Sequence, residues 1–156
     1  MKLIEKAMLD FTIVRKKIIT VVDEIDESKL MIIPDKLSNN IYWQCGHLVT
    51  TQASLLYKRT NSEIPLDDKY FNYFAKGTSP ENFDNAIPPF LKIREEMEAL
   101  VEYTANNLNR DADLKYPDEI TVSTGHIIDS FASALAFLAI HEAHHLGSIS
   151  TLRKLL

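Results

Sequence analysis

Hydrophobic residues recur at intervals of three and four along four long stretches of the chain, which is the spacing of amphipathic helices. The first stretch is the clearest, with apolar residues at Ile4, Met8, Phe11, Val14, Ile18, Val22 and Ile25. The four predicted helices cover residues 3–25, 40–60, 88–107 and a last stretch from 122–125 almost to the end. No segment alternates convincingly between apolar and polar residues as a strand would. The pattern therefore predicts an all-α fold, an antiparallel four-helix bundle.

The connection between the second and third predicted helices is unusually long. Residues 61–86 contain prolines, a glycine and the aromatic cluster Tyr70–Phe74. Long irregular loops are uncommon in small bundles and are often functional. The cluster is compatible with lining a pocket, covering the end of the bundle, contacting a second subunit or anchoring the loop itself. We expect this segment to be a long crossover. Residues 109–121 are expected to form a second, polar link.

Composition narrows the class of protein. The chain has 156 residues, 46 % hydrophobic and 25 % charged, which suits one globular domain spanning residues 1–156. The net charge is −5, and the basic run Arg15–Lys17 is expected to be a solvated helix face, so nucleic acid is not an expected partner. The single cysteine, Cys45, rules out an intrachain disulfide and fits a reducing compartment.

No segment has the unbroken apolar length of a transmembrane helix. Residues 1–6 carry charges where a signal peptide would have its apolar core. The sequence therefore predicts a cytoplasmic protein with no membrane partner.

The strongest chemical signal is the pentapeptide 141–145, which contains three histidines and one glutamate and follows an Ala- and Leu-rich run without Gly or Pro. That context favours a helix. At about 100° per residue, His141 and His145 lie roughly 40° apart on the apolar seam, whereas His144 points about 120° away. Two inward imidazoles one turn apart offer two nitrogen ligands to a metal. Burying them as ordinary core histidines would require polar partners for up to four ring nitrogens.

A third histidine stands on the second predicted helix. His47 lies where an apolar face meets the polar line of Gln44, Thr51 and Ser54, a position that suits either a boundary residue or a third ligand. Cys45 points to the opposite side of that helix and is not expected to be a ligand. His126 precedes His141 by more than three helical turns and is left outside the site.

Three metal chemistries compete for the pentapeptide. His141-Glu142-Ala143-His144-His145 matches the H-E-x-x-H of zinc proteases, with Glu142 as general base, but no downstream residue supplies a third ligand. A di-iron carboxylate bundle needs two Glu-x-x-His motifs, and only one is present. The third interpretation is a mononuclear site made by His47, His141 and His145.

Two short motifs resemble those of a known family. Trp43-x-x-Gly46-His47-Leu48 and His141-x-x-x-His145-x-Gly147 stand in the order and at the separation found in the DinB/YfiT-like superfamily of four-helix bundles. The resemblance covers nearly the whole chain. Members typically have glutamine after the last glycine, where this chain has Ser148.

The resemblance implies a divalent metal, often zinc or nickel, held by His47, His141 and His145 with a position open to water or substrate. Relatives include transferases that use a low-molecular-weight thiol such as bacillithiol, mycothiol or glutathione, as well as isomerases and hydrolases, and they are often homodimers. We therefore expect a metal-dependent thiol transferase or hydrolase acting on a small electrophilic molecule. The alternative is a non-catalytic metal-binding or stress-response protein. Glu142 is expected either to accept a proton in catalysis or to face a neighbouring helix, and His144 to support the ligands or lie on the surface.

Overall fold

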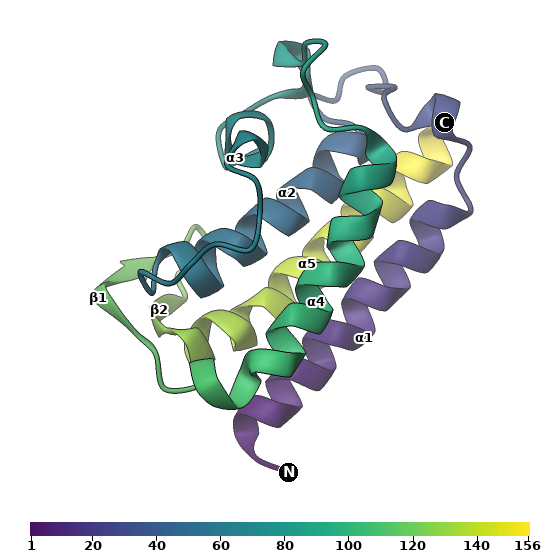
Figure 1. Ribbon diagram of the computed structural model, residues 1–156. Coiled ribbons are helices and arrows are strands. Elements are labelled where there is room, and N and C mark those ends of the chain that lie inside the picture. Colours follow the sequence, from purple (N-terminus) through teal and green to yellow (C-terminus); the bar gives the residue numbers. More distant parts are fainter.

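The computed structural model describes residues 1–156. Four long helices lie side by side (Figure 1): α1 (Leu3–Asp23), α2 (Ile41–Ala53), α4 (Phe90–Asp111) and α5 (Phe131–Leu155). Helix α5 packs against α1 and α2, and α4 packs against the other sides of α1 and α2. The predicted helical class is confirmed. None of the helices combines the length and apolarity that crossing a membrane requires.

Helix directions follow from the connections. Figure 1 shows α1 and α5 starting at one end of the molecule and α2 and α4 starting at the other. The two members of each pair are therefore parallel, and the two pairs run in opposite directions. Residues 59–89 return the chain along the bundle from the end of α2 to the start of α4. This segment contains the short helix α3 (Lys69–Phe74), so part of the stretch predicted to be irregular is helical.

The predicted start of the last helix, at residues 122–125, is wrong. A β-hairpin occupies this region, with antiparallel strands β1 (Lys115–Thr121) and β2 (Ile127–Ser130). Gly125 turns the chain with φ +85°, a conformation that residues with a Cβ rarely adopt. The Ser130 side chain then accepts a hydrogen bond from the backbone N–H of Ser133 and caps α5, which begins at Phe131.

The end of α2 departs from regular α-helix. Residues Ser54–Lys58 form a π-helical turn, where the predicted helix ran on to Thr60. The carbonyl of Leu55 in this turn accepts a hydrogen bond from the hydroxyl of Tyr116, a buried residue of β1. The hairpin is thereby fixed to the end of α2.

The expectation that the basic run Arg15–Lys17 forms a solvated face of α1 is wrong for Arg15. Lys16 and Lys17 are exposed as expected, but Arg15 is completely buried. It follows Phe11 by four residues and precedes Ile18 by three, and both neighbours are fully buried, so Arg15 lies on the apolar stripe of α1. A guanidinium is tolerated there only with polar partners, which α5 supplies.

Candidate metal centre

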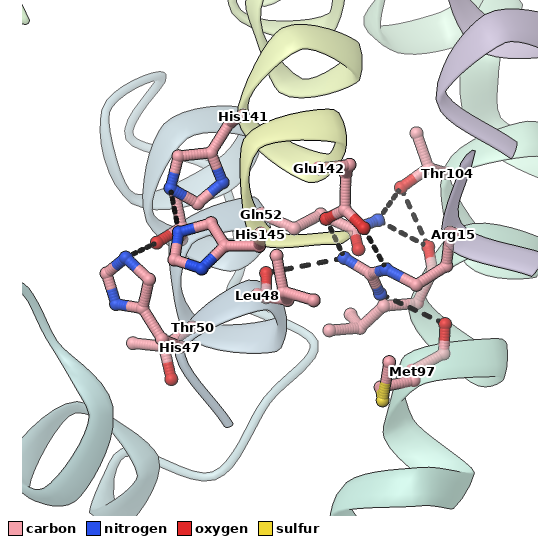
Figure 2. Close-up of polar contacts among 12 residues, drawn as sticks. Arg15, His47, Leu48, Thr50, Gln52, Met97, Thr104, His141, Glu142 and His145 are labelled. Atoms are coloured by element: carbon pink, nitrogen blue, oxygen red, sulfur yellow. Dashed lines mark hydrogen bonds and ion pairs between the residues drawn. The ribbon is translucent and has the colours of Figure 1, made fainter. Parts of the chain in front are cut away.

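Three imidazoles from two helices face one another near the middle of α5 (Figure 2). His47 comes from α2, and His141 and His145 come from successive turns of α5. One ring nitrogen of each residue lies within 4.8 Å of the corresponding nitrogen of the other two. The Nε2 atoms of His141 and His145 are 3.2 Å apart. The structure thus brings together the three histidines that the sequence singled out.

The ring of His47 is held by the crossover segment. Its Nδ1 is 2.8 Å from the backbone carbonyl of Phe74, the last residue of α3. A carbonyl only accepts, so Nδ1 carries the proton and Nε2 keeps its lone pair. The indole of Trp43 stacks on the imidazole with ring centroids 4.5 Å apart. The Thr51 hydroxyl lies 3.3 Å from Nε2. His47 is therefore oriented on both sides with Nε2 toward the other histidines.

The α5 pair is oriented differently. His145 Nδ1 is hydrogen-bonded to the side-chain oxygen of Gln44, which leaves Nε2 as the free nitrogen. His141 has a buried Nδ1 with no hydrogen-bond partner, and its Nε2 contacts only another ring nitrogen. An ordinary core histidine would have polar partners. His141 lacks them, so the cluster fits a cation better than it fits a hydrogen-bonded core.

The environment keeps the three rings neutral. Burial, with the neighbouring histidines adding to it, lowers the pKa of His141 to about 2. Burial also lowers the pKa of His145 to about 3 and moves the pKa of His47 below its usual value. Neutral imidazole is the form that coordinates metals, so no proton has to be displaced at neutral pH. Three neutral nitrogen donors suit zinc, nickel and other late first-row divalent ions.

Glu142 points away from the histidines. Figure 2 shows its carboxylate on the far side of α5, facing Arg15 of α1. The carboxylate oxygens lie 2.8 Å from Nε and 2.6 Å from Nη2 of Arg15, and both side chains are fully buried. The guanidinium also donates to the carbonyls of Met97 at 3.1 Å and Leu48 at 3.4 Å. Arg15 therefore links three other helices, and Glu142 has both oxygens engaged.

The remaining candidates lie outside the three-nitrogen cluster. His144 is exposed on α5, and His126 is exposed in the hairpin turn, where it is bonded to the Thr124 hydroxyl. Cys45 is completely buried, and burial raises the pKa of its thiol to about 12. A thiol in that state is protonated at neutral pH and is a poor ligand and nucleophile.

The three histidines open onto a pocket of about 890 Å³. Its walls come from the end of α2, the segment after α3, the hairpin turn and the exposed side of α5. The residues of the aromatic cluster Tyr70–Phe74 have different positions. Phe71 lines the pocket, whereas Tyr70 and Phe74 are buried in the core. The pocket therefore stays open beside the clustered ring nitrogens.

Gly46 explains how α3 reaches His47. A Cβ at this position would overlap the ring of Phe74. The absence of a side chain lets Phe74 pack directly on α2, which places its carbonyl against the His47 ring. The glycine of the Trp43-x-x-Gly46-His47 motif is thus a spacing requirement of the site.

Three residues that support the site were not recognised as such from the sequence. Arg15 had a usable signal, since it falls on the apolar stripe of its helix. Gln44 shares a polar line with His47, but its bond to His145 depends on how α2 and α5 pack. The Phe74 carbonyl has no side-chain signal, because any residue supplies a carbonyl.

The comparison with protein families agrees with the geometry. A sequence model described as the DinB superfamily matches residues 10–149, a range that contains all three clustered histidines. A search of curated proteins finds no match. The family match covers most of the chain, and the chain therefore belongs to the DinB superfamily.

Proposed function

We propose that this protein is a divalent-metal-dependent enzyme that activates a thiol, or else water, for attack on a small electrophilic molecule. His47, His141 and His145 would hold the ion, zinc or nickel by analogy with the family. The observation that carries the proposal is the convergence of three neutral ring nitrogens at the wall of an open pocket. When bound, such an ion lowers the pKa of a coordinated water or thiol toward neutrality.

The surrounding residues have definable tasks in this reaction. Gln44 and the Phe74 carbonyl hold the Nδ1 protons of two ligands, which fixes the tautomer and aims Nε2 at the centre. Thr51 places a hydroxyl beside His47 Nε2, within reach of a group bound there. These contacts preorganise the site before any substrate enters.

The size of the pocket favours thiol transfer over hydrolysis. About 890 Å³ is near the upper end of small-molecule sites and has room for a thiol and an electrophile together. Hydrolysis needs space for one substrate and a water, so it is the second candidate.

For Glu142 we propose a structural role. Both carboxylate oxygens are bound to Arg15, on the side of α5 away from the pocket. A proton acceptor has to reach the reacting group, directly or through one water. Glu142 instead joins α5 to α1 through Arg15 and so stabilises the packing of the two helices.

The alternative is a non-catalytic metal-binding protein. Such a protein has no need of a cavity at the open coordination position. Tyr70 and Phe74 pack into the core and leave the cavity uncovered, which favours the enzyme. A homodimer and a cytoplasmic location stay predictions.

Elemental analysis of the purified, untagged protein tests the proposal. We expect about one equivalent of a divalent metal per chain for the three-histidine site. His47→Ala should lose most of it, because three ligands become two, and His144→Ala should keep it as the matched control. Absence of metal in the wild type after incubation with zinc or nickel would contradict the proposal. With the site loaded, loss of thiol in the presence of an alkylating electrophile would then be the activity assay.

A further inference from the structure

The pocket beside the histidines differs in charge from the rest of the molecule. The chain has 22 acidic and 17 basic residues, yet none of the 19 residues lining this pocket is aspartate or glutamate. Two of them, Arg59 and Lys76, are basic. Neither takes part in an ion pair, although seven other basic side chains do. The pocket is therefore a cationic cavity in an acidic protein.

The two free cations occupy different ends of the pocket. Lys76 lines the pocket two residues after Phe74, whose carbonyl is 2.8 Å from His47 Nδ1, so it lies on the histidine side. Arg59 follows His47 by twelve residues, at the end of the π-helical turn, so it lies about three helical turns further along the chain. A ligand that reaches from the histidines to Arg59 is elongated.

Three neutral imidazoles add to this charge pattern. They would leave the full double positive charge of a bound divalent ion uncompensated, since no carboxylate belongs to the cluster. A concave surface with low-dielectric walls focuses such a potential toward the pocket. Two serine residues, Ser54 and Ser123, also line it and offer hydroxyl groups as hydrogen-bond donors.

We propose that the pocket selects an elongated organic anion. The reacting end lies at the three histidines, and a carboxylate, phosphate or sulfonate elsewhere on the molecule is bound by Arg59, with Lys76 neutralising charge near the reacting end. Charge-assisted hydrogen bonds of this kind are stronger than neutral ones and favour anions over isosteric neutral molecules. The inference rests on the proposed function, because it assigns the substrate class of the same site.

A pair of dyes tests the charge requirement. 8-Anilinonaphthalene-1-sulfonate is an aromatic anion, and N-phenyl-1-naphthylamine is the same ring system without the sulfonate. Fluorescence titrations measure the affinity for each dye in the zinc-loaded wild type and in Arg59→Gln/Lys76→Gln. The control is Lys16→Gln/Lys17→Gln, which removes the same charge from exposed positions on α1. We expect the sulfonate to bind the pocket variant about tenfold more weakly or worse. The neutral dye should bind all three proteins equally.

Three results would overturn the proposal. One is the absence of sulfonate binding by the wild type. Another is equal sulfonate affinity in the wild type and the pocket variant. The last is equal weakening of both dyes, since that would reflect pocket shape and not charge.

The metal proposal and the anion proposal fail separately. Metal content of Arg59→Gln/Lys76→Gln is measured alongside and should equal that of the wild type. The titrations are repeated on His47→Ala, which should still prefer the sulfonate to the neutral dye although it lacks metal. If the wild type takes up no metal but its affinity for the sulfonate still depends on Arg59 and Lys76, the anion proposal holds and the metal-enzyme proposal is wrong. If the wild type binds metal but its affinity for the sulfonate does not depend on these two residues, the metal proposal holds and the anion proposal is wrong.

Discussion

One turn of α5 carries two polar side chains, of which one has all its hydrogen-bonding atoms paired and the other does not. Glu142 faces α1 and has both oxygens bound to Arg15 in a fully dry environment. His141, its neighbour in the chain, faces the pocket with a buried Nδ1 that has no partner. Buried polar groups that serve stability are satisfied, because leaving one unpaired costs free energy. The difference supports the proposals of a functional histidine side and a structural Glu142 side.

The largest effect is expected on the structural side. Arg15→Met leaves the Glu142 carboxylate buried without a counter-charge, so the free energy of unfolding should fall by about 3–5 kcal/mol in urea titrations. Arg15→Met/Glu142→Leu removes both charges and should recover most of that loss, since apolar replacements of buried pairs are often neutral. The double variant should also bind metal normally. Equal destabilisation in the single and double variants would contradict the structural role of the pair.

The next effect tests how α3 supports the pocket side. Gly46→Ala introduces a Cβ that overlaps the Phe74 ring, and such overpacking typically costs about 1–3 kcal/mol. Because α3 must move, His47 should also lose its carbonyl acceptor and the protein should bind metal more weakly. Gly147→Ala, where a Cβ meets open space within α5, is the matched control: it should leave metal binding unchanged and should not lower stability, since alanine is the better helix former. Unfolding curves and metal titrations measure both. A Gly46→Ala protein with unchanged metal affinity would contradict the supporting role of α3.

The smallest effect isolates one hydrogen bond. Gln44→Leu removes the acceptor of His145 Nδ1–H, and loss of such a partner typically weakens metal binding about 10–100-fold. Gln52→Leu, on the same helix, breaks bonds to the Leu100 carbonyl and the Thr104 hydroxyl of α4, a helix that contributes no histidine to the cluster. That control should lower stability and leave metal affinity unchanged. Competition with a zinc chelator measures the affinities, and equal affinities in the two variants would show that Gln44 does not position His145.

Helix periodicity predicted most of the architecture. The stripes of α1 and α4 indicate one buried face each, whereas α2 is buried on almost every side. The helix ends follow prolines and caps such as Asn40, whose side chain accepts from Trp43 N–H. The hairpin was missed because Pro117 and the polar residues of β1 hide its alternation. Ile127 and Ile128 also continue smoothly into the apolar run of α5. Two residues in the sequence do signal the break: Gly125 forms the turn, and Ser130 caps the start of α5.

For the candidate site, sequence spacing was sufficient to group the histidines and insufficient to assign their surroundings. Two histidines four residues apart share a helix face whatever the tertiary structure. The sequence leaves the direction of Glu142 open, because only the packing of α1 against α5 decides which side it joins. Contacts between elements far apart in the chain, such as His145 with Gln44, depend on docking and not on local pattern.

The hydrogen bond from His47 to the Phe74 carbonyl has a consequence for sequence variation. The acceptor belongs to the main chain, so any residue at position 74 supplies it, and the packing of the Phe74 ring on Gly46 decides where it lies. What does remove it is a change in the path of the backbone. The exposed residues of 59–89 should therefore tolerate many substitutions. Insertions or deletions between Arg59 and α3 should be tolerated poorly, because a change in length there shifts the carbonyl relative to the ring that it orients.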